Sequence, residues 1–199
     1  MPVRRTSKPS TDRILEAAER VFAERGYGEV SLRQLMAAAK VSTTAFYARF
    51  DSKEAVMSAL TTRLLGELHA EAPSVLDRAR DLESGIERGV DLLCDRFAPR
   101  QALVRMILSE AGSSRATTVA RQRAYGLLAA FLAARLEALA ARDRIAPGDP
   151  AALAWALVGA LEIQIVRWAV WDEIDLAALR AQLRAAATAI LPRTKQEDG

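Results

Sequence analysis

Hydrophobic residues recur along most of the chain at the three- and four-residue spacing of amphipathic helices, without sustained alternation of apolar and polar positions. Ala, Leu, Arg and Glu, which favour helices, are abundant. The pattern predicts an all-α protein of about nine helices. The expected helices span residues 11–25, 32–39, 43–49, 53–69, 74–97, 101–113, 116–142, 150–171 and 175–190.

Residues with known end preferences mark the first three helices. Gly26 is placed to end the first helix in a left-handed conformation. Ser31 and Gln34 form the pattern of a capping box, in which each side chain satisfies a free backbone N–H of the second helix. Ser42 is expected to cap the third helix after a tight turn at Lys40 and Val41.

The fourth helix is predicted to begin after Asp51 or Ser52, with Glu54 placed to complete a capping box from Asp51. Pro73 is expected to punctuate its end, because proline breaks the hydrogen-bond ladder of a helix interior.

The two short helices with a tight turn between them have the spacing of a helix-turn-helix. Phe46 and Phe50 lie four residues apart and are expected to pack inward with Val41. The residues expected to face outward are Ser42, Thr43, Thr44 and Tyr47. Small hydroxyl residues in a first turn allow a helix to enter a major groove, and Arg49 and Lys53 add positive charge beside it. Spacing alone leaves an ordinary helical hairpin equally open.

Charge and composition narrow the class of protein. The net charge is only +3, but the first ten residues contain Arg4, Arg5 and Lys8 without an acid, which fits either a DNA-binding arm or a solvated terminus. One cysteine, Cys94, excludes an intrachain disulfide framework and fits a reducing compartment. The apolar segment 151–170 contains Glu162, Gln164 and Arg167, so we interpret it as a helix of a soluble, cytoplasmic protein.

The stretch from Ile14 to Leu60 resembles the DNA-binding domain of the TetR (tetracycline repressor) family of transcription regulators. The matching pieces, in order, are Ile14-Leu15-Glu16-Ala17-Ala18, Phe22-Ala23-Glu24-Arg25-Gly26-Tyr27, Ser31-Leu32-Arg33, Val41-Ser42, Phe46-Tyr47, Phe50 and Ser52-Lys53-Glu54. The remaining chain is similar to the family only in architecture and length.

The resemblance implies a homodimeric, ligand-responsive regulator, by default a repressor, that binds double-stranded DNA at a two-fold operator. It implies that Thr43 and Thr44 lie over the bases and that Arg33 reaches a phosphate or a base. Phosphate contacts are implied for Ser31, Ser42, Tyr47 and Lys53.

This sequence departs from the family pattern at three positions. Lys40 replaces a glycine at a turn position that often needs a left-handed backbone, at a cost of about 1 kcal/mol, and could add a phosphate contact. Thr44 also replaces a glycine, so base preference can differ, and Met36 replaces a small residue.

The last two long helices carry apolar stripes with small residues, which fit a four-helix bundle across a two-fold axis or packing inside one subunit. The residues that we predict for the dimer interface are Trp155, Gly159, Ile163, Val166, Leu179, Leu183 and Ala186. An effector pocket is expected to be enclosed by the helices from Pro73 to Arg142. Its candidate lining residues, each of which could instead be ordinary core, are Ile86, Val90, Cys94, Met106, Tyr125, Leu128 and Trp168.

Glu162 in its apolar helix needs a partner if buried. We expect Arg105 or Arg167 in a structural ion pair, or else a cationic ligand.

We therefore divide the chain into a basic flexible arm (1–10), a DNA-binding domain (11–56), a connecting part of the fourth helix (57–72), a C-terminal effector-binding and dimerisation domain (73–192) and a flexible tail (193–199). No enzymatic activity, cofactor or metal site is expected, because the sequence has one histidine, one cysteine and no phosphate-binding glycine loop. The alternative function is a helical small-molecule or partner-binding protein without operator-specific control.

Overall fold

The computed structural model describes residues 10–109, 114–141 and 148–191, and all regular secondary structure in these ranges is helical. The expected all-α fold is thereby confirmed. The helices are α1 (Ser10–Arg25), α2 (Leu32–Ala39), α3 (Thr43–Tyr47), α4 (Lys53–Leu76), α5 (Leu82–Phe97), a 3₁₀ turn (Ala98–Arg100), α6 (Gln101–Leu108), α7 (Arg115–Ala140), α8 (Pro150–Ala169) and α9 (Leu176–Ile190). The predicted arm, apart from Ser10, and the predicted tail lie outside the described residues.

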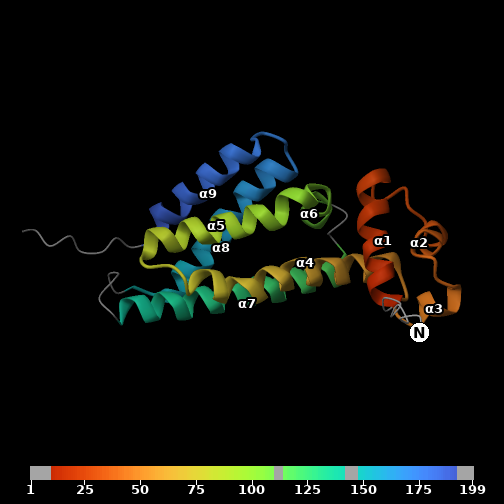
Figure 1. The fold of residues 1–199 in the computed structure, drawn as a ribbon, viewed down its shortest axis with the longest axis horizontal. Helices are drawn as coiled ribbons and strands as arrows, with labels where there is room; N and C mark the ends of the chain where they lie inside the picture. Colours follow the sequence, from red (N-terminus) through yellow and green to blue (C-terminus); the bar gives the residue numbers. More distant parts are fainter. Residues whose placement is uncertain (1–9, 110–113, 142–147, 192–199) are drawn as a thin grey trace, which may run out of the picture.

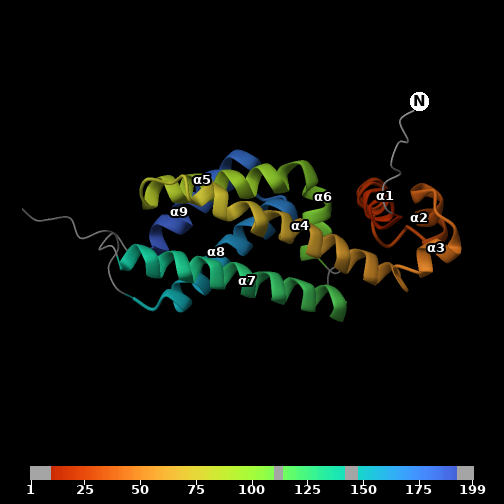
Figure 2. The same cartoon turned by 60° about the horizontal axis from the view of Figure 1, so that its bottom comes forward.

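The helices form two groups that share α4. Figure 1 shows α1, α2 and α3 gathered at one end of α4, while α5 to α9 surround its other end. The second view confirms that α7 runs alongside α4 and that α8 lies between α7 and α9 (Figure 2). The long helix α4 therefore carries the small N-terminal group on the larger C-terminal bundle.

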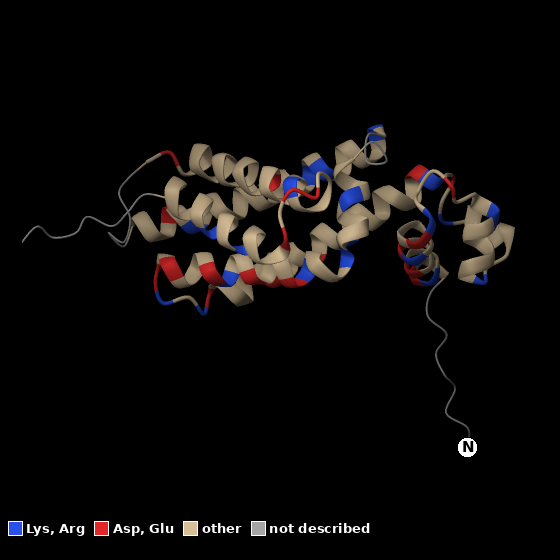
Figure 3. Ribbon diagram, turned by 90° about the horizontal axis from the view of Figure 1, so that it is seen from above, with Lys and Arg blue, Asp and Glu red and all other residues tan. Residues whose placement is uncertain are grey.

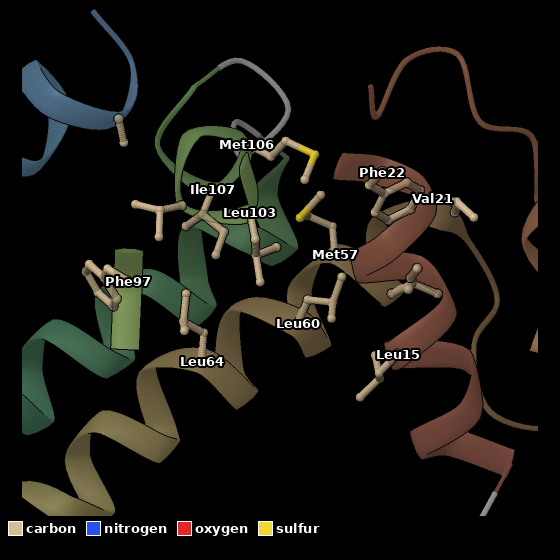
Figure 4. Close-up of a cluster of buried hydrophobic side chains, with 14 of the residues drawn as sticks. Leu15, Val21, Phe22, Met57, Leu60, Leu64, Phe97, Leu103, Met106 and Ile107 are labelled. Atoms are coloured by element: carbon tan, nitrogen blue, oxygen red, sulfur yellow. The ribbon is translucent and has the colours of Figure 1, made fainter. Parts of the chain in front are cut away.

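A continuous hydrophobic core crosses the junction between the two groups. Figure 4 shows Phe22 of α1, Met57 and Leu60 of α4, and Leu103 and Met106 of α6 converging there. Leu60 and Phe22 are each 1% exposed. Burying side chains of this size contributes about 1.5–3 kcal/mol each, so the small group is packed against the bundle and not merely tethered to it.

A network of ion pairs lies at the same junction. Arg63 of α4 pairs with Glu19 of α1 at 2.8 Å, and Arg100 pairs with Glu19 at 3.0 Å and with Glu67 of α4 at 2.6 Å. These side chains are 22–34% exposed, so each pair stabilises only modestly. They link α1, α4 and the 3₁₀ turn and add to the apolar packing between them.

The prediction that Pro73 ends the fourth helix is wrong. α4 continues through Pro73 to Leu76, and the Asp77 N–H donates to the Pro73 carbonyl at 2.9 Å. Proline forfeits one hydrogen bond in the helix interior, but α4 is packed against both α5 and α7 there, with Ala72 buried. This packing outweighs the lost bond. The next helix consequently begins at Leu82 and not at residue 74. Asp81 caps it by accepting from the Ser84 N–H.

Four further helix ends differ from expectation: α3 stops at Tyr47, α6 at Leu108, α7 at Ala140 and α8 at Ala169. After α3 the chain tightens, because the Arg49 N–H donates to the Phe46 carbonyl three residues earlier, at 2.8 Å.

Within the part of the chain that the structure describes, α8 is long and apolar enough to cross a membrane, with a mean hydropathy of 1.3. That test is weak evidence, since core helices also pass it. One side of α8 packs in the interior through Ala154, Leu157, Val158, Ile165 and Trp168. The other side is exposed and apolar, which raises the hydropathy of the helix further.

Candidate nucleic-acid interface

The start of α2 is fixed by the capping box expected from the sequence. The Ser31 hydroxyl accepts from the Gln34 N–H at 3.3 Å, and the Gln34 carboxamide oxygen accepts from the Ser31 N–H at 2.8 Å. Arg33, in the first turn of α2, is exposed. The interior side of the helix is held by Leu35, which is 0% exposed, so Ser31 and Arg33 are held at the surface by a rigid helix.

The turn between α2 and α3 places Lys40 in the left-handed region, with φ 53° and ψ 45°, as the resemblance implied. The Lys40 N–H donates to the Ala37 carbonyl and the Val41 N–H to the Met36 carbonyl. These two bonds are those of a Schellman motif, which normally uses glycine at the left-handed position. Lys40 therefore makes the turn that the family makes with glycine, at a conformational cost, and its side chain is exposed.

The third helix exposes the face predicted for DNA contact. Ser42 caps it by accepting from the Ala45 N–H at 3.2 Å. Phe46 is 0% exposed, which anchors the opposite face in the core. The side chains left exposed are Ser42, Thr43, Thr44, Tyr47 and Arg49, with Tyr47 52% exposed. The predicted division into inward and outward residues is confirmed.

The helix-turn-helix carries positive charge without compensation. Residues 31–50 contain Arg33, Lys40 and Arg49 and no Asp or Glu. In Figure 3 the α2–α3 region is coloured only tan and blue, whereas red segments gather on α1. A surface of this kind attracts a polyanion.

Lys53 has a structural role that the sequence did not show. Its ammonium group donates to the Tyr27 carbonyl at 2.8 Å and to the Val30 carbonyl at 3.2 Å, and lies 4.4 Å from the centroid of the Tyr27 ring. It thereby ties the loop between α1 and α2 to the start of α4. The predicted phosphate contact of Lys53 stays a prediction, and its ammonium group is already engaged in the free protein.

Glu54 does not complete a capping box with Asp51, contrary to expectation. Ser52 is the cap of α4, accepting from the Ala55 N–H at 3.0 Å. Glu54 instead accepts from the Tyr27 hydroxyl at 3.2 Å. Burial and this carboxylate raise the pKa of Tyr27 to about 12.

Two cavities lie in the C-terminal bundle, and they divide the residues predicted for an effector pocket. Tyr125 and Leu128 line a cavity of about 70 Å³, and Ile86 and Val90 line a second of about 350 Å³. The other three line neither cavity, because their side chains are used in core packing: Cys94 is 0%, Trp168 4% and Met106 8% exposed. Burial, more than the nearby Asp91, raises the pKa of the Cys94 thiol to about 11.

The residues predicted for a dimer interface are also divided by the structure. Leu179 and Leu183 of α9 are each 0% exposed, so they are core residues of one subunit and cannot face a partner. On α8, Trp155 is 53% and Ile163 43% exposed, and Gly159 is exposed beside them. The two remaining residues of the predicted interface, Val166 and Ala186, are partly buried.

Glu162 pairs with neither arginine proposed for it. Its Oε1 accepts from the Tyr125 hydroxyl at 2.9 Å. Arg105 donates to the Ala169 carbonyl and pairs with Asp172, and Arg167 pairs with Glu173.

The fold and the exposed α3 face define a helical protein with a helix-turn-helix head mounted on a larger bundle. Residues 14–60 match the family model described as bacterial regulatory proteins, tetR family. This N-terminal segment, from α1 into the first part of α4, is therefore a tetR-family domain.

Curated relatives match part of the chain. The HTH-type transcriptional repressor Rv3405c of Mycobacterium tuberculosis is 36% identical over 94 residues, covering 38% of this chain and 50% of the relative. The HTH-type transcriptional regulator EthR of the same species is 32% identical over 112 residues, covering 51% and 50%. The chain thus matches about half the length of these relatives.

Solved structures share the fold over nearly the whole chain. A Syntrophomonas wolfei protein assigned to the TetR family superimposes with a TM-score of 0.80 at 19% identity, covering 92% of this chain and 95% of that one. Thermus thermophilus FadR, a TetR-family repressor solved in complex with lauroyl-CoA, has a TM-score of 0.68 at 24% identity, covering 95% and 99%. At these identities the likeness shows the fold alone, and it extends to the C-terminal bundle.

Proposed function

We propose that this protein is a ligand-responsive transcriptional repressor that binds a two-fold DNA operator as a homodimer in the bacterial cytoplasm. The observation that carries the proposal is the exposed face of α3. Ser42, Thr43, Thr44 and Tyr47 point outward from a helix whose other face is locked by Phe46. Side chains held by a rigid element read a groove with little ordering cost.

Base and phosphate contacts divide along this face. Thr43 and Thr44, in the first turn of α3, present a hydroxyl and a methyl each to base edges, and Arg33 is a third reader. Ser31, Ser42, Tyr47, Lys40 and Arg49 surround them and contact phosphates. Phosphate contacts fix the register and the affinity, and base contacts fix which sequence is recognised.

The dimer forms through the exposed apolar stripe of α8, with the partly buried Ala186 of α9 beside it. An exposed Trp155 and Ile163 on one helix face are unusual for a free monomer surface and favour association. Gly159, between them in sequence, allows two helices to approach closely. A two-fold axis through α8 presents two copies of α3 to successive half-sites.

An effector is proposed to bind among α4 to α8, where the cavities lie. α4 connects these cavities to the reading head, so a ligand that displaces α4 would change the spacing of the two copies of α3. The names of similar proteins support control of DNA binding by a ligand, since one is called a repressor and another was solved with an acyl-CoA.

The test is selection of binding sites from a pool of duplexes with a random central segment, using the full chain. We expect enrichment of a sequence with two-fold symmetry, whose half-sites are about one helical turn apart. A protein that only binds small molecules or protein partners would enrich no sequence, and that outcome would overturn the proposal.

A further inference from the structure

The smaller cavity is enclosed by α4, α5, α6, α7 and α8. Its wall is almost entirely apolar, formed by residues such as Leu64, Leu68, Leu93, Phe97, Ile107 and Ile165. Figure 4 shows Leu64, Phe97 and Ile107 at the junction of α4, α5 and α6. Three polar side chains line the same cavity: His69, Tyr125 and Glu162.

Glu162 is a carboxylate in this apolar setting with a single neutral partner. Tyr125 donates to Oε1 at 2.9 Å, and no ion pair to Glu162 exists within residues 10–109, 114–141 and 148–191. Arg121, one turn of α7 before Tyr125, donates to the Ile107 carbonyl. Glu162 is partly buried beside this apolar wall. A carboxylate there is better stabilised by a cation than by a neutral donor alone, so Glu162 is suited to a positive ligand.

The neighbouring polar groups support the same conclusion. Burial and Glu162 raise the pKa of Tyr125, which keeps its hydroxyl protonated and pointed at the carboxylate as a donor. The Nδ1 atom of His69 is buried without a hydrogen-bond partner. Such an atom is uncommon in a folded protein and is explained when a ligand supplies the missing group.

We propose that this cavity binds a small apolar monocation, a protonated amine whose ammonium group contacts Glu162 and whose carbon chain lies against the leucines of α4. The cavity volume of about 70 Å³ is roughly half that of a cavity known to take benzene. An amine with more than a few carbons therefore has to displace Leu64 and Leu68. An effect of the bound amine on DNA affinity would rest on the proposed function, whereas the amine site itself does not.

The experiment titrates the full chain, without DNA, with n-butylamine, n-butanol and butyrate, and follows the methyl NMR signals of the leucines that line the cavity. We expect the amine to bind about tenfold more tightly than the alcohol, since charge-assisted hydrogen bonds are the stronger kind. Butyrate should not bind.

The decisive variant is Glu162→Gln, which keeps the acceptor for Tyr125 and removes the charge. It should weaken amine binding about tenfold and leave butanol binding unchanged. Unchanged butanol binding also shows that the variant folds. Glu137→Gln, at an exposed position of α7, removes the same charge elsewhere and should leave the binding of both butylamine and butanol unchanged.

Equal binding of amine and alcohol, or an amine preference that survives in Glu162→Gln, would overturn the proposal. This outcome differs from a failure of the proposed function. If amine binding depends on Glu162 but leaves DNA affinity unaltered, the amine site stands and its regulatory role does not.

Discussion

At the scale of single residues, Lys40 combines a backbone cost with a possible gain. Its φ of 53° suits glycine, while its exposed side chain adds a positive charge at the turn that leads into α3. The two effects can be separated by substitution, because glycine and alanine both remove the charge and only glycine tolerates the left-handed conformation without strain.

Lys40→Gly is expected to raise the free energy of unfolding by up to about 1 kcal/mol, whereas Lys40→Ala should not raise it. Urea unfolding of both variants measures the difference. Both should lose the same amount of DNA affinity, since the ammonium group is absent from each. A stability gain in the alanine variant would contradict the strain argument.

The division of labour on α3 gives a second prediction. Thr44→Ala is expected to change which base is preferred at one position of each half-site, by about 1–3 kcal/mol. Tyr47→Phe removes only a hydroxyl and should weaken binding to all duplexes alike. Competition binding against a set of single-base operator variants separates these outcomes. Identical behaviour of the two variants would mean that base and phosphate roles are wrongly assigned.

At the scale of helices and loops, Lys53 holds the α1–α2 loop on α4 before any DNA is present. Lys53→Met keeps most of the aliphatic stem and removes the donor. It should lower the free energy of unfolding by roughly 1.5–3 kcal/mol, the range for hydrogen bonds that involve a charged group.

Arg49→Met is the matched control, because the Arg49 side chain is exposed and makes no hydrogen bond or ion pair within the described part of the chain. Its unfolding in urea should be nearly unchanged. If both variants lost the same stability, the Lys53 contacts would not contribute as the structure indicates.

Local signals were sufficient for the elements of the reading head. The capping box at Ser31, the cap at Ser42 and the inward turn of Phe46 all depend on residues within four positions of one another. The left-handed turn at Lys40 was instead expected from the resemblance to the family, which has glycine there. Sequence reasoning therefore located the exposed α3 face correctly.

Long-range packing decided the features that sequence reasoning missed. Pro73 stays helical because α5 and α7 hold α4 on both sides. The apolar stripe that contains Leu179 and Leu183 has the same sequence pattern whether it faces a partner subunit or the core. Only the tertiary structure shows that α5 and α8 cover α9. Lys53 and Tyr27 meet across 26 positions, which periodicity cannot reveal.

At the scale of the whole molecule, the exposed stripe on α8 is the surface proposed to join two subunits. Ile163→Asp places a charge in its centre and should shift the protein from dimer to monomer in light scattering. Operator affinity should fall with it, because one α3 reads only half of the site.

Val119→Asp is the control: Val119 is 54% exposed, on α7, and outside the stripe. It should leave the mass and the operator affinity unchanged. A dimer that persists in Ile163→Asp would place the interface elsewhere.

The central claim is that the exposed face of α3 reads a DNA sequence. The most direct measurement is the affinity for the selected duplex and for a scrambled duplex of the same composition, each titrated with salt. We predict a steep linear fall of log affinity with log salt, and a preference for the selected duplex on the order of 10³-fold or more near physiological salt. Equal affinities for the two duplexes, or no binding at that salt, would contradict the account.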